Sequence, residues 1–460
     1  MRLETIGHAT LLLQDAAGAP LLATDPWLTG STYWRSWWIE NYPGPAEIAR
    51  LAASPWLYIS HEHPDHYHPP SLRLLRDQGA DPQVLLPPFL SMGMEGHLQE
   101  LGYRTRRLPE EGWLRLAPDL QVLSIALWNN DSILLLDTPE ALIVNLNDAK
   151  PDDRSLRRLG ALRAALGKRC VLLRSYSPAS PMNSYWQNGK RVERGGKRGY
   201  VRAAAKACRL IGADDFVPFA SQVVFRRADT DWANDFKVRY ADLRRFWGAP
   251  ARLHQPYSCL ELGGAEVTRQ DPATFDPHVT ARTRALVAEQ EEANRQARFT
   301  PKDHARLEQS LRQLRSLLRA WLPKGFSIKA DGVRLFWNSL RGRLEQRDKH
   351  SKAGHFTLSM PLLPLKQAAT FGHLGDLSIP MFTRIELHGP TRPRRVDVFF
   401  MLLILRDYGY LGAPGRTLRW LRWAAKLRLQ ARRPLPRPDA AAPTSAAAPQ
   451  AGGLAPARGK

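Results

Sequence analysis

The sequence predicts a layered α/β sandwich followed by a mainly helical C-terminal extension. The first 220 residues alternate short apolar runs, of the length of buried strands, with amphipathic stretches of helical period. These runs also fall into two groups separated by helical stretches, which is typical of two sheets covered by helices. A chain of 460 residues, 43% of them hydrophobic, can bury a core of this size.

The predicted elements follow one another through this first region. The segments RLETIGH, TLLLQD and PLLATD predict three strands, with a turn at Ala17 and Gly18 between the last two. Further apolar runs predict strands at 56–60, 132–138, 141–147, 170–175 and 215–220, the second and third of which form a hairpin. Helical patterns occupy residues 69–78, 90–101, 152–166 and 198–211.

The chain changes character after about residue 270. Residues 279–321 contain two amphipathic helical segments, and the chain resembles a folded protein up to about residue 412. After Arg433 it becomes rich in Ala and Pro and lacks residues that could form a core. We therefore predict three regions: a first domain at 1–270, a helical extension at 271–433 and a disordered tail at 434–460.

The composition limits the partners and the compartment. The chain carries 66 basic and 44 acidic residues, a net charge of +22, which favours an anionic small-molecule substrate; solubility alone is the alternative explanation. No segment interleaves basic and aromatic residues as nucleic-acid modules do, so a nucleic-acid partner is not expected. The three cysteines, Cys170, Cys208 and Cys259, lie far apart and form no CxxC pair. This pattern predicts that the protein resides in the reducing cytoplasm.

Membrane association is predicted at one segment only. The N-terminal sequence does not have the pattern of a signal peptide, and the longest apolar run, 398–405, is too short to span a bilayer. Residues 415–433 are basic and amphipathic, which predicts a peripheral membrane contact; a helix packed on the domain is the alternative. Two faces of this helix are segregated, the apolar one with Trp420, Trp423 and Leu427 and the basic one with Arg419, Arg422 and Lys426.

A cluster of histidines and acids directly follows the predicted strand 56–60. In the segment YISHEHPDHYHPPSL (58–72), the order His-x-His-x-Asp-His is filled by His61, His63, Asp65 and His66. Imidazole and carboxylate groups are ligands that suit Zn, Fe or Mn. Loops at the end of a sheet commonly carry functional residues. The spacing therefore predicts a metal centre, and a histidine-rich surface loop is the alternative.

This pattern resembles the first ligand motif of the metallo-β-lactamase superfamily, whose fold is an αββα sandwich. The resemblance implies that the two leading histidines bind one metal and that the Asp-His pair binds a second. It also implies that Asp148, in VNLNDAK, bridges the metals and that Asp25, in LLATDPWL, orients the histidines. His8, in IGHATLLL, is either a further residue of the site or a strand-end histidine without a catalytic role. The candidate ligands are His61, His63, Asp65, His66 and Asp148, of which the two aspartates are also the candidate catalytic residues.

The segments DPWL, SHEHPDH, NLNDAK, SPMNSYW and VPFAS resemble, in order and spacing, the catalytic domain of the CMP-N-acetylneuraminate hydroxylases over roughly residues 5–265. The chain departs from that family in two ways. No cysteine is followed by a histidine at the Cys-x-His or Cys-x-x-His spacing of a Rieske centre, so no such centre is expected. No histidine lies between His97 and His254, where the superfamily usually supplies further ligands. The substitutes at hand are Asn129, Asn130, Asp131 and the distant His254.

The resemblance implies a metal-dependent hydrolase in which water activated by Zn or Fe, as one or two ions, attacks an anionic small molecule such as a nucleotide- or sugar-linked compound. Two alternatives stay open. One is an iron-dependent monooxygenase like the hydroxylase, with electrons from a separate redox partner. The other is a non-catalytic binding protein with a degenerate metal site.

Overall fold

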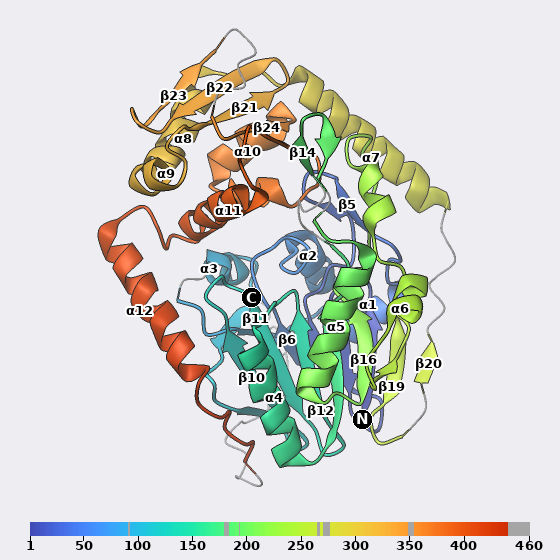
Figure 1. Ribbon diagram of the computed structural model, residues 1–460. Coiled ribbons are helices and arrows are strands. Elements are labelled where there is room, and N and C mark those ends of the chain that lie inside the picture. Colours follow the sequence, from blue (N-terminus) through green and yellow to red (C-terminus); the bar gives the residue numbers. More distant parts are fainter. Residues whose placement is uncertain are drawn as a thin grey trace, which may run out of the picture.

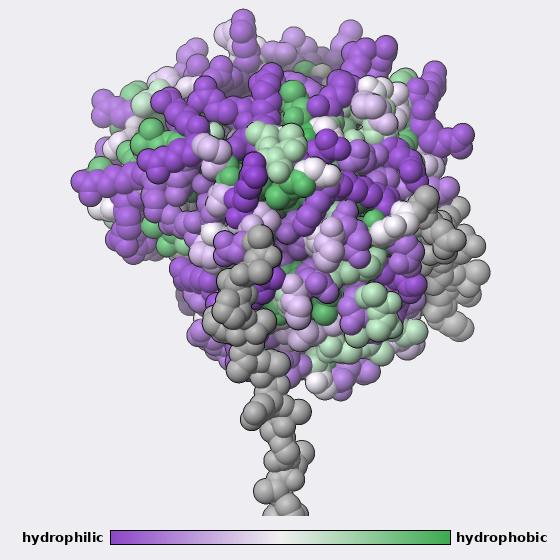
Figure 2. Space-filling view, turned by 90° about the horizontal axis from the view of Figure 1, so that it is seen from below, coloured by the Kyte–Doolittle hydropathy of each residue, from purple (hydrophilic) through white to green (hydrophobic). Residues whose placement is uncertain are grey.

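The computed structural model describes residues 1–90, 93–178, 184–192, 194–264, 267–269, 277–347 and 354–439. In the view of Figure 1 a sandwich of strands and helices fills the lower half, most of the C-terminal region, coloured yellow to orange, lies above it, and the red helix near the C-terminus runs down its left side. The face seen from below in Figure 2 is mainly hydrophilic, with small scattered hydrophobic patches. No helix among the described residues is long and apolar enough to cross a bilayer.

The first sheet of the sandwich has eight strands in the order β20-β19-β1-β2-β3-β6-β7-β8. The four strands β3, β6, β7 and β8 run parallel, because each is joined to the next by a helix. Those helices are α1 (Pro45–Ala52), α2 (Pro69–Asp77) and α3 (Gly93–Glu100). The strands are β1 (Arg2–Ile6), β2 (Thr10–Gln14), β3 (Pro20–Thr24), β6 (Trp56–Tyr58), β7 (Gln83–Leu86), β8 (Arg104–Arg107), β19 (Ser258–Glu261) and β20 (Val267–Arg269).

The second sheet has seven strands in the order β18-β16-β13-β12-β11-β10-β9. The predicted hairpin is confirmed, because β11 and β12 pair antiparallel with Leu135 opposite Val144. Strands β12, β13, β16 and β18 run parallel and are joined by α4 (Asp153–Leu166), α5 (Lys197–Ile211) and α6 (Tyr240–Phe246). The strands are β9 (Leu114–Ala117), β10 (Leu120–Ala126), β11 (Ser132–Asp137), β12 (Ala141–Asn147), β13 (Arg169–Ser175), β16 (Asp215–Phe219) and β18 (Arg252–Leu253).

The two sheets pack face to face because successive side chains of a strand point to opposite sides. In β2, Leu11 and Leu13 belong to the core between the sheets, whereas Leu12 belongs to the core on the outer side of its sheet. In β12, Ile143 lies between the sheets, and Val144 packs in the outer core with α4 and α5. The layers are therefore helices, sheet, sheet and helices, which confirms the predicted αββα sandwich.

The helices α4 and α5 approach each other closely at Gly160. A Cβ atom at this position would lie 2.5 Å from the carbonyl oxygen of Leu210 in α5, so only glycine fits without displacement of the backbone.

The C-terminal region is mainly helical, as predicted, but it also contains a sheet that the sequence analysis did not anticipate. Its order is β15-β14-β25-β24-β21-β22-β23. The helices are α7 (Pro277–Gln296), α8 (Pro301–Arg312), α9 (Arg315–Trp321), α10 (Leu362–Phe371), α11 (Pro393–Asp407) and α12 (Pro414–Gln430). The strands that follow residue 270 are β21 (Phe326–Ala330), β22 (Val333–Asn338), β23 (Arg343–Gln346), β24 (Phe356–Met360) and β25 (Arg384–Leu387).

Two strands of this third sheet come from the first region of the chain. They are β14 (Tyr185–Gln187) and β15 (Lys190–Arg191), and β14 pairs in parallel with β25. A small sheet in the order β17-β5-β4 lies beside the sandwich, with β4 (Ser31–Thr32), β5 (Trp37–Ile39) and β17 (Val223–Phe225). The predicted boundary at residue 270 is therefore not a boundary between sheets, because the third sheet contains strands from both sides of it.

The predicted start of the disordered tail at residue 434 was wrong. Leu435 is buried in the core beneath α4 and α5, and the Trp113 indole N–H donates to the carbonyl oxygen of Pro436 at 2.8 Å. Residues 434–439 thus pack against the sandwich, because Leu435 supplies one more apolar side chain to its core. The rest of the predicted disordered tail lies outside the described residues.

Candidate metal centre

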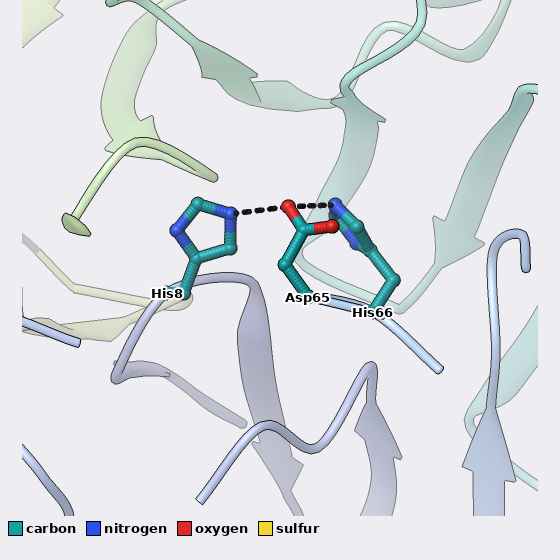
Figure 3. A group of neighbouring side chains, drawn as sticks. All are labelled: His8, Asp65 and His66. Carbon is teal, nitrogen blue, oxygen red and sulfur yellow. Dashed lines mark ion pairs between the residues drawn. The ribbon is translucent and has the colours of Figure 1, made fainter. Parts of the chain in front are cut away.

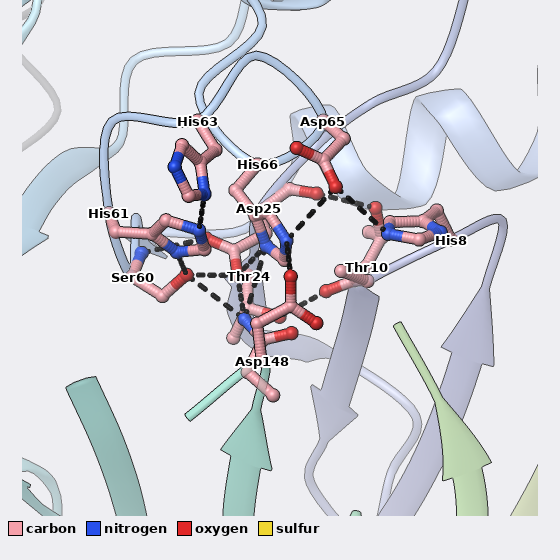
Figure 4. Close-up of polar contacts among 12 residues, drawn as sticks. His8, Thr10, Thr24, Asp25, Ser60, His61, His63, Asp65, His66 and Asp148 are labelled. Carbon is pink, nitrogen blue, oxygen red and sulfur yellow. Dashed lines mark hydrogen bonds and ion pairs between the residues drawn. The ribbon is translucent and has the colours of Figure 1, made fainter. Parts of the chain in front are cut away.

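The histidine cluster occupies the loop after β6, at the carboxyl end of the parallel strands. Asp25 directly follows β3, the neighbour of β6, and Asp148 directly follows β12 in the facing sheet. The carboxyl ends of these strands meet at one edge of the sandwich, so three segments far apart in sequence bring their polar side chains together. Figure 4 shows this convergence, with the strands below the cluster and the loop above it.

Two groups of side chains there have the composition of a metal site. One is His8, Asp65 and His66, and the other is His61, His66 and Asp148; within each group the ligand atoms lie within 4.8 Å of one another. His66 is common to both groups.

Asp65 and Asp148 lie on either side of the His66 ring nitrogen. The His66 Nε2 atom is 3.4 Å from Asp65 Oδ2 and 3.4 Å from Asp148 Oδ2. The same Asp65 oxygen is 3.3 Å from His8 Nε2, so Asp65 lies between two imidazoles, as Figure 3 shows. Its other oxygen accepts a hydrogen bond of 2.8 Å from the Tyr33 hydroxyl. Asp65 is thus held from three sides.

His63 is placed differently from the other candidate ligands. Its Nδ1 atom is 2.8 Å from His61 Nε2, a hydrogen-bond distance, and it belongs to neither ligand group. Its Nε2 atom is buried and has no hydrogen-bond partner among the described residues. The structure thus places four of the five predicted ligands in the two groups, with His63 beside them. Their binding of a metal stays a prediction.

Asp25 fixes the orientation of His66. Its Oδ1 accepts from the Ser60 backbone N–H at 2.7 Å, and its Oδ2 accepts from the Ser60 hydroxyl at 2.7 Å and pairs with His66 Nδ1 at 3.0 Å. The Asn147 amide also donates to Oδ2. Because the Nδ1 atom of His66 is hydrogen-bonded to Asp25, its Nε2 atom faces Asp65 and Asp148. This is the positioning role that the resemblance implied for Asp25.

The backbone is strained at two residues of this network. Asp25 has φ of 39° and Asn147 has φ of 50°, a left-handed region that residues other than glycine seldom adopt. Both directly end or follow a strand, and both turn their side chains toward Ser60 and His66. Strained backbone of this kind is concentrated at functional sites, where the surrounding structure has to hold it.

The local charges favour a bound cation. Burial lowers the pKa of His61 and of His63 to about 4, so both imidazoles are neutral near pH 7, the state in which they bind metals. Burial opposes the ionisation of Asp65 and Asp148, but the nearby His66 holds the pKa of Asp65 well below its usual range and that of Asp148 at about 2. Burial also opposes the charge of His66, yet Asp65 and then Asp148 raise its pKa well above the usual range. Buried, ionised carboxylates such as those of Asp65 and Asp148 are stabilised by a nearby positive charge, which a divalent ion can supply.

His8 is the ligand candidate that the sequence left open. Its side chain is buried, and both of its ring nitrogens lack a hydrogen-bond partner among the described residues. Gly7, with φ of +61°, makes the turn between β1 and β2 that carries it. The rings of Trp27 and Trp37 pack against the imidazole at centroid distances of 5.6 and 6.3 Å. A buried imidazole that makes no hydrogen bond within the described part of the chain and faces Asp65 at 3.3 Å has the donor atom that a metal site requires.

None of the substitutes proposed for the missing histidines belongs to either ligand group, and metal binding by Asp131, which lies near His63, stays a prediction. Asp131 accepts a hydrogen bond of 2.7 Å from Asn129, and Asn130 accepts one from the hydroxyl of Tyr410. His254 lies 2.7 Å from Asp215, which also binds an arginine, and this pair belongs to neither ligand group. The suggestion that His254 completes the site was therefore wrong. His254 directly follows β18, and the pairing of β18 with β16 places its ring beside Asp215 instead.

Several residues of the site were not found from the sequence. Ser60 and Asn147 each directly precede a candidate ligand, and that adjacency was the only available signal. Tyr33 and Tyr410 lie far from the motifs in the sequence, and no pattern marked them.

A cavity of about 540 Å³ adjoins the ligand loop. The loop contributes Glu62 and Pro64, and Tyr33 lines the cavity while it donates to Asp65. The C-terminal region contributes His373 and Asp376 from the opposite side. Burial, with Asp407 and then Asp65 nearby, raises the pKa of Asp376 to about 8. The two regions of the chain therefore share the walls of this cavity.

Comparison with known proteins gives partial matches in sequence, and no protein-family profile matches the chain. The chain is 32% identical over 189 residues to a "Putative Rieske 2Fe-2S iron-sulfur protein" of Mycobacterium tuberculosis, which covers 39% of this chain and 35% of that protein. It is 32% identical over 96 residues to the cytidine monophosphate-N-acetylneuraminic acid hydroxylase of Asterias rubens, covering 18% of this chain and 15% of the hydroxylase. The match to the Danio rerio hydroxylase is 38% over 79 residues, or 17% and 13% of the two chains.

Solved structures with a similar arrangement include a variant of CmlA beta-hydroxylase, with a TM-score of 0.38, 17% identity and coverage of 58% of this chain and 54% of that one. The zinc-bound PqqB of Methylobacterium extorquens has a TM-score of 0.32 and 10% identity, covering 57% and 100% of the two chains. A metallo-beta-lactamase fold protein of Bacillus subtilis, YhfI, has a TM-score of 0.36 and 10% identity, covering 56% and 96%.

The chain is an αββα sandwich with a His-x-His-x-Asp-His segment in the loop after β6. Its predicted resemblance to the CMP-N-acetylneuraminate hydroxylases is confirmed over part of the sequence. The chain spans about a third of the first relatives it matches.

Proposed function

We propose that the chain is a metal-dependent enzyme, and that hydrolysis is its reaction. The observation that carries this proposal is the pair of three-residue groups that share His66, with buried ring nitrogens on His8, His63 and His66 that make no hydrogen bond among the described residues. Three protein ligands and an open position are the composition of a catalytic metal site. Zn or Fe, as one or two ions, suits this donor set of imidazoles and carboxylates.

A bound ion in such a site acts as a Lewis acid and lowers the pKa of a water molecule to about 7. The protein supplies the rest. Asp25 fixes the tautomer of His66, and Tyr33 restrains Asp65. The side chain of Asp148 is 24% exposed, whereas those of Asp65 and His66 are almost fully buried, so water and substrate reach the site from the side of Asp148. Its carboxylate is ionised near neutral pH and can accept a hydrogen bond from water.

Oxygenation is the second candidate, favoured by the sequence match to the hydroxylases. It would require iron and a separate electron donor, because no cysteine of this chain has the histidine spacing of a Rieske centre and the three cysteines are buried.

The anionic substrate remains a prediction from the net charge. The cavity beside the ligand loop has Glu62 and Asp376 among its lining, and no Lys or Arg is among the described residues that line it. An anionic group of the substrate would therefore bind outside this cavity, nearer to the ion.

The test is the metal content of the full chain, purified without added metal. Zinc at about one or two ions per chain supports hydrolysis, and iron supports oxygenation. The double variant His61→Ala with His63→Ala should lose most of the metal and keep the fold by circular dichroism. His373→Ala is the matched control, since that imidazole is exposed and lies outside both ligand groups. A wild-type chain that binds no transition metal, or a double variant that binds it undiminished, refutes the enzymatic proposal.

A further inference from the structure

The helix α12 presents an apolar stripe to solvent. Leu418, Leu421 and Leu429 are 48%, 50% and 57% exposed, and they are among the few large hydrophobic side chains with this degree of exposure. Together with the exposed Ala425 they are spaced by three, four and four residues, which keeps them on one side of the helix. We call these four residues the leucine stripe.

The leucine stripe is not the face that the sequence analysis singled out. Trp423 is buried, and Trp420 and Leu427 pack against the same core. The Trp423 ring lies 5.9 Å from that of Tyr410, and the Trp420 indole N–H donates to the carbonyl oxygen of Trp128 at 3.3 Å. The tryptophan face therefore fixes the helix on the protein.

The orientation of α12 is thus determined, and its outer side is free. Lys426 pairs with Glu110 and holds the lower half of the helix against the sandwich. In Figure 1, α12 runs along the edge of the molecule, and no other element lies on its outer side.

The charges beside the leucine stripe are all positive. No acidic residue occurs between Pro414 and Gln430, and Arg422 and Arg428 border the stripe on its two sides. No described residue forms an ion pair with Arg416, Arg419 or Arg422, so these charges are available to an outside partner. An apolar stripe bordered by arginines, on a helix rigidly attached by its opposite face, matches a surface with anionic groups above a hydrocarbon layer.

We propose that α12 docks the protein on an anionic lipid surface, with the leucine stripe inserted among the acyl chains and the arginines at the headgroups. The charge complementarity selects this occupant, because a second copy of α12 would bring the same arginines face to face. This docking is independent of the metal chemistry.

The experiment uses the full chain and phosphatidylcholine vesicles with and without phosphatidylserine, in co-sedimentation at low salt. Wild-type protein should bind only the anionic vesicles, and binding should weaken as salt rises, because exposed charges are screened. The triple variant Leu418→Gln, Leu421→Gln and Leu429→Gln should bind about tenfold more weakly or worse. These side chains are exposed, so the variant should fold as the wild type does.

The matched control is a triple variant of exposed hydrophobic residues in other elements, Leu317→Gln, Leu340→Gln and Phe371→Gln, which should bind as the wild type does. Wild-type protein that ignores anionic vesicles at low salt overturns the proposal, as does a stripe variant with unchanged binding. Dimerisation in solution that the stripe variant abolishes, without vesicle binding, would assign the stripe to a second copy and also overturn it.

Discussion

Replacement of Asp25 by asparagine should weaken metal binding, although Asp25 belongs to neither ligand group. The carboxylate interacts with four hydrogen-bonding groups: the backbone N–H and hydroxyl of Ser60, the ring of His66 and the amide of Asn147. An asparagine there keeps one acceptor oxygen, and its NH₂ group must face donors on the other side. His66 then loses the partner that holds its tautomer.

When a metal-bound histidine loses the group that is hydrogen-bonded to its other ring nitrogen, metal affinity typically falls about 10- to 100-fold. In free energy this is about 1.4 to 2.8 kcal/mol. The unpaired buried groups should also destabilise the metal-free protein by about 1–3 kcal/mol. Zinc affinity would be measured by competition with a chromophoric chelator, and stability by urea unfolding of the metal-free chain.

Asp119→Asn is the control, because Asp119 is exposed and removed from the site. A smaller decrease is expected for Ser60→Ala, which removes one of the groups bonded to Asp25. An Asp25→Asn variant that folds and binds zinc as tightly as the wild type would refute the positioning role of Asp25.

Three further predictions concern the site and the core. His8→Ala should lower metal content or affinity about tenfold or more, as measured by metal analysis after dialysis; unchanged content would remove His8 from the ligand set. Metal uptake near pH 7 should release about one proton, because the pKa of His66 is raised and its proton must leave, so affinity should rise with pH until that pKa is passed. Calorimetry in buffers of different ionisation enthalpy counts the protons, and none released contradicts the charge assignment. Gly160→Ala should destabilise the fold by about 1–3 kcal/mol in urea unfolding, whereas Gly199→Ala in α5, which meets no neighbouring atom, should not.

The sandwich could be predicted because its signals are local. The strands of the first region are short apolar runs, and the ligand loop begins where one of them ends. The convergence of Asp25 and Asp148 on that loop follows from parallel strands that end at a common edge. The role of the region around Asn130 could not be predicted, because it depends on Tyr410, which is 280 residues away. His8 was undecided because a strand-end histidine has the same local sequence whether or not Asp65 faces it.

The third sheet was missed for a related reason. Strand β14 is short and lies in a segment that reads as a polar loop, and it becomes a strand only by pairing with β25 about 200 residues later. The exposed and buried faces of α12 were likewise undecided, since both Trp423 and Leu421 are apolar. Only the packed structure distinguishes the side chain that fills the core from the one that faces solvent.

The exchange of strands between the two regions limits how the chain can be divided. A fragment that ends at residue 270 would keep β14 and β15 but lose β25, and the edge of β14 that pairs with β25 would be left open. An unpaired edge of this kind recruits strands from other molecules. The ring of Trp34, which now donates to Gln367, would lose its cover as well. The first 270 residues are therefore an unsuitable unit for isolated expression or for domain transplantation.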